Sequence, residues 1–125
     1  MKRNKEMIDV SEPLPESTVG FKTIHHIKSD ENYIGYVEAS YLQKKDVKAF
    51  KRLKRKLKVG QPFGVQVFID VEKSGVTAST LGKEGLLELV EALKTKLKGV
   101  EERDIYIMEL LGKKRNMIGR ATDLK

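Results

Sequence analysis

Residues 63–72 read FGVQVFIDVE, and apolar side chains occupy every second position of this stretch. Successive side chains of a β-strand point to opposite faces, so this spacing places one set of apolar side chains together. The side chains on that shared face are Phe63, Val65, Val67, Ile69 and Val71. The stretch therefore predicts a strand with one face in the core. We expect residues 73–75 to turn the chain into a short return strand at 76–79.

Two further hairpins are predicted on either side of this one. Residues 19–27 and 33–41 are rich in β-branched and aromatic side chains, and the polar turn KSDEN separates them. On one face of the first strand we expect Phe21, Thr23, His25 and Ile27, and on one face of the second Tyr33, Val37, Ala39 and Tyr41. Residues 104–111 predict a strand that turns through GKKRN into a last strand at 117–122.

Two amphipathic helices complete the pattern. In residues 46–58, Asp46 is a candidate N-cap, and the apolar stripe consists of Val47, Phe50, Leu53 and Leu57. Gly60 and Pro62 favour the end of this helix. In residues 83–98, the apolar stripe consists of Leu86, Leu89, Val90, Leu93 and Leu97. Acidic residues precede basic ones along this second helix, which complements the helix dipole.

The order of elements predicts an α+β fold: an antiparallel sheet built from hairpins, with two helices on one face. The two helices end alike, in RKLKVG and TKLKGV, which suggests a ββα-ββα-ββ order that arose by duplication. Residues 1–18 contain Pro13 and Pro15 and no apolar period, so we expect a polar N-terminal arm there. Residues 19–125 are predicted to form a single domain.

Composition narrows the class of protein. The chain has 125 residues, of which 39% are hydrophobic and 34% charged, as in soluble globular domains. The absence of cysteine excludes disulfides and thiolate chemistry. There is neither an eighteen-residue apolar run nor an apolar signal region, so we expect a cytoplasmic protein without a membrane partner, compatible with nucleoid or virion association and with a viral or plasmid origin. The Lys and Glu bias resembles thermophile composition.

The net charge is concentrated in residues 44–58, which read KKDVKAFKRLKRKLK. Nine cations less one anion give this segment +8, whereas the whole chain carries +7, so the other residues sum to −1. A helix here would bury its apolar stripe and expose an almost purely cationic face. Residues 83–98 mix both signs, so the basic segment is not simply typical of this chain. A localised basic surface indicates an anionic partner.

A second basic cluster lies in the predicted C-terminal hairpin, and by itself it is better explained as an ordinary charged β-turn than as a binding site. The residues that we predict to bind nucleic acid in the two clusters are Lys44, Lys45, Lys48, Lys51, Arg52, Lys54, Arg55, Lys58, Lys113, Lys114, Arg115 and Arg120. In the basic segment only Arg52 and Arg55 are arginines. Lysine lacks the bidentate fork that reads base edges, so the composition favours backbone contacts with little sequence preference.

Other motifs have less specific interpretations. His25 and His26 are adjacent, so a regular strand would point them to opposite faces, where they could not bind one metal ion. Tyr33, Tyr36 and Tyr41, with Phe21, could stack on bases from an open sheet, although strand aromatics usually pack across strands.

Four carboxylates near strand ends could hold Mg²⁺ in a nuclease: Asp70, Glu72, Asp104 and Glu109. Their spacing is equally that of ordinary charged turns.

The sequence thus predicts a non-catalytic nucleic-acid-binding protein that contacts the phosphate backbone of DNA or RNA through the cationic helix at 46–58. We expect no cofactor, and pairing at a sheet edge would give a homodimer. One alternative is a small adaptor or inhibitor that docks its basic helix on an acidic protein. A second alternative is a metal-dependent nuclease.

Overall fold

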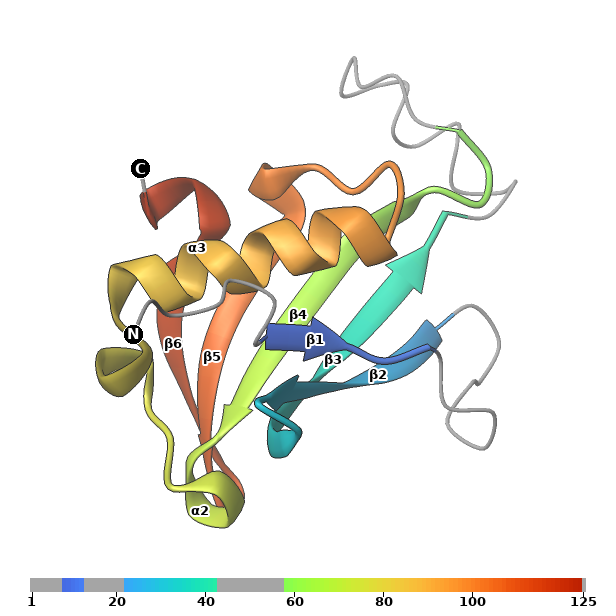
Figure 1. Ribbon diagram of the computed structural model, residues 1–125. Helices are drawn as coiled ribbons and strands as arrows, with labels where there is room; N and C mark the ends of the chain where they lie inside the picture. The colour runs from blue at the N-terminus through green and yellow to red at the C-terminus, as the bar shows by residue number, and fades with distance from the viewer. Residues whose placement is uncertain (1–7, 13–21, 43–57, 125) are drawn as a thin grey trace.

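The computed structural model describes residues 8–12, 22–42 and 58–124. They form a six-stranded mixed sheet with a long helix across one face (Figure 1). The strands are β1 Ile8–Val10, β2 Lys22–Ser29, β3 Asn32–Tyr41, β4 Pro62–Asp70, β5 Ile105–Leu111 and β6 Lys114–Arg120. The helices are α2 Val71–Ser74 and α3 Ala78–Lys96, with 3₁₀ turns η4 Glu102–Asp104 and η5 Ala121–Leu124. The α+β class is confirmed.

The strands follow each other across the sheet in chain order, from β1 to β6. Each neighbouring pair is antiparallel except β4 and β5, which are parallel. Two parallel neighbours need a crossover connection, and α3 provides it. The prediction of a fully antiparallel sheet is therefore wrong at its centre, whereas the hairpins β2–β3 and β5–β6 are confirmed.

The return strand predicted at 76–79 is replaced by helix. Asp70 ends β4, and its Oδ1 accepts a hydrogen bond of 3.1 Å from the Lys73 backbone N–H, which caps α2. Thr77 and Thr80 then form a reciprocal capping box at the start of α3. Because the chain enters a helix instead of a hairpin here, the ββα-ββα-ββ order and the duplication are not confirmed.

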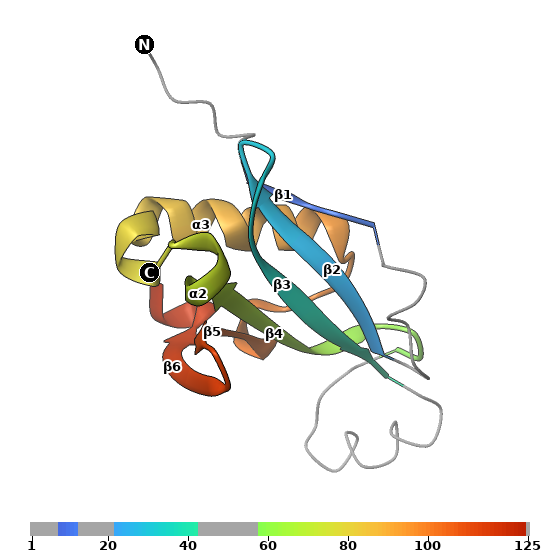
Figure 2. The same ribbon diagram turned by 90° about the horizontal axis from the view of Figure 1, so that it is seen from below.

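The helix predicted at 83–98 is confirmed, and it is the principal layer over the sheet (Figure 2). Gly82 has non-helical backbone angles (φ 72°, ψ 172°), so the regular part of α3 follows it. The predicted stripe is buried in full: Leu86, Leu89, Val90, Leu93 and Leu97. The helix predicted at 46–58 lies almost entirely outside the described residues.

Strand β4 supplies the centre of the core. Val65, Val67 and Ile69 are completely buried on the side of α3, as the alternation predicts. Phe68 points to the other side of the sheet and is also completely buried. Only the last part of β4, residues 67–70, is buried on both faces, since Gln66 on the side of Phe68 is exposed.

The β2–β3 hairpin turns through two residues with left-handed backbone angles, Asp30 (φ 53°) and Glu31 (φ 69°). The register then shifts, because Lys28 pairs with Tyr33 while Ile27 pairs with Gly35. This bulge places Ile34 in the core and Tyr33 beside His26 on the other side of the sheet. The prediction that Tyr33 shares a face with Val37 is therefore wrong.

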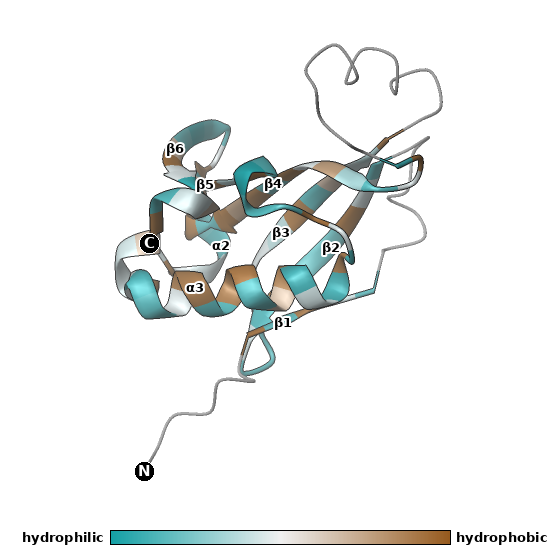
Figure 3. Ribbon diagram, turned by 90° about the horizontal axis from the view of Figure 1, so that it is seen from above, coloured by the Kyte–Doolittle hydropathy of each residue, from teal (hydrophilic) through white to brown (hydrophobic). Residues whose placement is uncertain are grey.

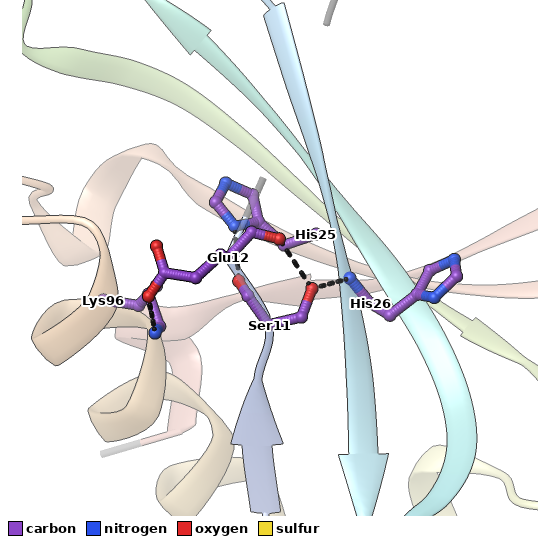
Figure 4. Close-up of polar contacts among 5 residues, drawn as sticks. All are labelled: Ser11, Glu12, His25, His26 and Lys96. Atoms are coloured by element: carbon purple, nitrogen blue, oxygen red, sulfur yellow. Dashed lines mark hydrogen bonds and ion pairs between the residues drawn. The ribbon is translucent and has the colours of Figure 1, made fainter. Parts of the chain in front are cut away.

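Within the segment expected to be a polar arm, Ile8–Val10 forms the edge strand β1, and both terminal residues are buried. His25, almost fully buried, fixes this edge through its Nδ1, 2.8 Å from the Ser11 carbonyl oxygen (Figure 4). A carbonyl only accepts, so Nδ1 donates this hydrogen bond, and Nε2 lies 3.0 Å from the Thr23 hydroxyl oxygen. Glu12 then pairs with Lys96 of α3 at 2.7 Å.

We predict that Gly35→Ala destabilises the protein while Gly64→Ala does not. A Cβ on Gly35 would overlap the Phe68 carbonyl oxygen and lie 3.1 Å from the Ile69 Cα, so β3 and β4 would have to separate. Overpacking of this kind costs about 1–3 kcal/mol or more. Gly64 is the matched control, since its Cβ would meet only Ser40 at an ordinary 3.7 Å. Urea unfolding followed by circular dichroism should separate the two variants, and equal midpoints would contradict the close approach.

Candidate nucleic-acid interface

The side of the sheet away from α3 presents two rows of side chains that run across five strands. The strand register aligns a first row of Ile24, Glu38, Gln66, Tyr106 and Arg120. It aligns a second row of His26, Tyr36, Phe68, Met108 and Met117. We call these ten residues the outer face. Figure 3 shows α3 along one side of the sheet and the β5–β6 hairpin toward the opposite side.

Aromatic rings and guanidinium groups pack together on the outer face. The rings of Tyr36 and Phe68 are stacked, with centroids 5.0 Å apart and planes at 28°. Arg115 lies over the Phe68 ring at 5.1 Å, and Arg120 lies over the Tyr106 ring at 5.2 Å. Phe68 is therefore fully covered, whereas both tyrosines are only partly buried. The result is a set of rings held in fixed orientations with part of their surface accessible.

The β5–β6 hairpin brings a group of cations to the edge of this face. Residues 111–120 contain four cations and no anion. All four side chains are exposed, and none forms an ion pair with the described residues: Lys113, Lys114, Arg115 and Arg120. We call these four residues the hairpin cations. Lys114 and Arg115 belong to β6 itself, because the chain turns at Gly112 (φ 61°) and Lys113.

Four carboxylates lie on or near the outer face and its β6 edge. Glu38 belongs to the first row and is partly buried. Asp70 is buried at the end of β4, where it caps α2, and Glu72 lies against Gly112 at the tip of the hairpin. The Asp123 Oδ2 accepts a 2.8 Å hydrogen bond from the Arg120 backbone N–H at the other end of β6. The β6 edge thus carries four cations with a carboxylate near each end, and Glu38 places a negative charge near the middle of the face.

Asp70 also affects the pKa of Tyr33, whose hydroxyl group lies beside its carboxylate. The Tyr33 hydroxyl donates a long hydrogen bond of 3.4 Å to the Asp70 Oδ2. Burial raises the pKa of Tyr33 to about 12, and the Asp70 carboxylate adds to the effect by its charge and by this hydrogen bond. Burial also raises the pKa of Tyr36, with a further contribution from Glu38, while Arg115 opposes it. Both rings are therefore held in the neutral form.

Most of the basic segment lies outside the described residues. The predicted site residues in that position are Lys44, Lys45, Lys48, Lys51, Arg52, Lys54 and Arg55. Lys58 is described and exposed, and its backbone N–H donates to the Gln61 Oε1 at 3.1 Å. Lys113, Lys114 and Arg115 are consecutive at the tip of the β5–β6 hairpin, and Arg120 is at the other end of β6. In the strand register Arg115 and Arg120 share the side of the outer face, whereas Lys114, which pairs with Leu111, is one position out of step.

The predicted aromatic set divides between the two sides of the sheet. Tyr33 and Tyr36 lie on the side of the outer face, Tyr41 packs against the core, and Phe21 lies outside the described residues. Phe68 and Tyr106 are not among the aromatic residues predicted to stack. The available signal was alternation, since each lies one position out of step with the core-facing residues of its own strand.

Histidines and carboxylates occupy structural positions. His25 and His26 point to opposite sides of the sheet, as expected: His25 is buried, and His26 contacts Tyr33 edge-on at 5.2 Å. The Glu109 Oε2 accepts a 2.7 Å hydrogen bond from the Ala78 backbone N–H at the start of α3. In the part of the chain that the structure describes, no three acidic or histidine residues are arranged to hold a metal ion.

The chain matches no protein-family model, and comparisons with curated proteins and with solved structures found no match either. Within residues 8–12, 22–42 and 58–124, no helix is long and apolar enough to cross a membrane.

We predict that Tyr33→Phe makes the protein less sensitive to alkaline pH. The unfolded tyrosine has a pKa of 10.0 and the folded one a pKa of about 12. Between these pH values the unfolded chain loses a proton that the folded chain keeps. The contribution of Tyr33 to the free energy of unfolding is therefore fully present below pH 10 and is lost as the pH rises toward 12.

Urea unfolding at pH 8 and at pH 11.5 should show a smaller loss of stability for the variant than for the parent chain. In an alkaline titration of the folded protein followed by absorbance at 295 nm, the variant should lack the tyrosine that ionises last. Identical alkaline losses in both proteins would contradict the assignment to Tyr33.

Proposed function

We propose that this protein binds nucleic acid without catalysis, through contacts to the phosphate backbone that depend little on sequence. The observation that carries the proposal is that the hairpin cations are exposed and form no ion pair with the described residues, beside a sheet face that presents aromatic rings. Exposed Lys and Arg in a cluster release counterions when they neutralise phosphates, which makes binding favourable and salt-dependent.

Three cations elsewhere in the described part of the chain form ion pairs. Lys94 pairs with Glu102 at 2.9 Å, Lys96 pairs with Glu12 at 2.7 Å, and the Arg103 Nε lies 2.9 Å from Glu101. An ordinary solvated surface mixes the two signs in this way. Exposed lysines elsewhere, such as Lys22, Lys58 and Lys83, also form no ion pair with the described residues. The hairpin is distinguished by clustering, because residues 111–120 contain four cations and no anion.

The basic segment at 44–58 is a second cluster of cations that could bind phosphate. It carries +8, and seven of its nine cations are lysines. Lysine acts as a point charge toward phosphate and contributes little to base readout. We expect binding that loses affinity steeply with salt and discriminates weakly between sequences. A homodimer formed through a sheet edge, which would double the cationic surface, stays a prediction.

We predict that Lys113→Glu combined with Lys114→Glu weakens binding to labelled DNA or RNA at least tenfold at low salt. Each lost phosphate contact should also lower the slope of log K against log salt by about 1. The matched control is Lys83→Glu with Lys98→Glu, which changes the net charge equally at exposed lysines of α3 and the turn after it.

Fluorescence anisotropy across a salt series measures both quantities. If the hairpin variant and the α3 control lose affinity equally, the effect is one of net charge alone and the hairpin is not the site. If the parent protein binds no nucleic acid at low salt, the proposed function is wrong, and an acidic protein becomes the partner to seek. Charge reversal at Lys51, Arg52 and Arg55 tests the basic segment in the same assay.

A further inference from the structure

We propose that the outer face binds single-stranded nucleic acid, with bases stacked on Tyr36 and Tyr106 and phosphates held by the hairpin cations. This inference rests on the nucleic-acid binding proposed above and adds the strand state and the stacking residues. DNA and RNA offer the same bases and phosphates to this surface, so the two are arms of the test.

Neighbouring side chains pack against the rings of Tyr36 and Tyr106. Tyr36 lies on Phe68, which in turn lies under Arg115, and Tyr106 lies under Arg120. Each tyrosine is therefore held in one orientation before a ligand arrives, which lowers the entropic cost of binding. Every base has a π-face, so such rings bind a strand with little regard to sequence, in agreement with the lysine-rich electrostatics.

The spacing of the rings favours a single strand. Tyr36 is on β3 and Tyr106 on β5, one row apart. Strand and residue spacings in sheets place their Cα atoms roughly 12 Å apart, more than three times the 3.4 Å rise between stacked bases in a duplex strand. Bases that reach both rings must leave their own stack, and duplex bases do so only at the cost of unpairing.

The charges around the rings define where the backbone runs. The hairpin cations lie at the β6 edge, while Glu38 occupies the row of Tyr106, beside Gln66. A carboxylate repels phosphate, so the backbone should pass over the cationic edge and the bases over the middle of the sheet. Arg115 and Arg120 suit this edge because a guanidinium can stack on a ring and still donate hydrogen bonds to phosphate.

The test compares variants that remove the two aromatic rings with variants that keep them. We expect Tyr36→Leu combined with Tyr106→Leu to weaken binding to labelled oligo(dT) or oligo(rU) by about tenfold or more, since each stacked base contributes on that order. Affinity for a labelled duplex and the salt slope should stay unchanged, because the cations remain. Tyr36→Phe combined with Tyr106→Phe keeps both rings and should bind as tightly as the parent.

A second readout does not depend on a disruptive variant. The chain has four tyrosines and no tryptophan, so stacking should quench its tyrosine fluorescence directly. Saturation with oligo(dT) or oligo(rU) should quench the parent, and the double Phe variant should lose that quenching while it keeps its affinity. Glu38→Gln should strengthen binding severalfold by removing the negative charge near the bases.

The outcomes separate the two proposals. Ring-dependent binding of either oligonucleotide supports the inference, and the tighter one identifies the sugar. If single strands and duplex bind equally, without tyrosine quenching, the outer face is not a stacking surface although the protein binds nucleic acid. If no nucleic acid binds at low salt, both proposals are wrong.

Discussion

The parallel pairing of β4 with β5 is the constraint on which the rest of the structure depends. Parallel neighbours cannot be joined by a tight turn, so α3 must cross over the sheet between them. The crossover covers one side with a helix, against which Val65, Val67 and Ile69 are completely buried. It also fixes the outer face on the opposite side, where Tyr36 and Tyr106 lie on β3 and β5.

Much of this arrangement could be predicted from periodicity, because buried faces impose it. Val65, Val67 and Ile69 of the alternating stretch and the stripe of α3 are buried, whereas Phe63 is only partly buried and Val71 belongs to α2. The parallel pair could not be predicted in this way, since the strand pattern does not encode the direction of the partner. The decisive local signals were the N-cap of Asp70 and the capping box of Thr77, which begin helices where a return strand was expected.

The candidate site was only partly predictable for a related reason. The cations of residues 113–115 stand out in sequence because charge is visible residue by residue. Their position beside Phe68 and Tyr106 depends on strand register across β4, β5 and β6, which no local pattern reports. Tyr33 shows the limit of counting by twos, since one bulged residue moved it to the other side of the sheet.

Cross-strand packing alone explains part of the outer face. It accounts for Phe68, which is fully buried between Tyr36 and Arg115. It does not account for two arginines that lie over rings without a carboxylate partner, at an edge where residues 111–120 carry no anion. An apolar side chain packed on the ring would bury it as well as an arginine does. Arginines beside partly accessible aromatic rings are explained if the surface binds a ligand that carries both negative charge and flat aromatic groups. Nucleic acid carries both, in its phosphates and its bases.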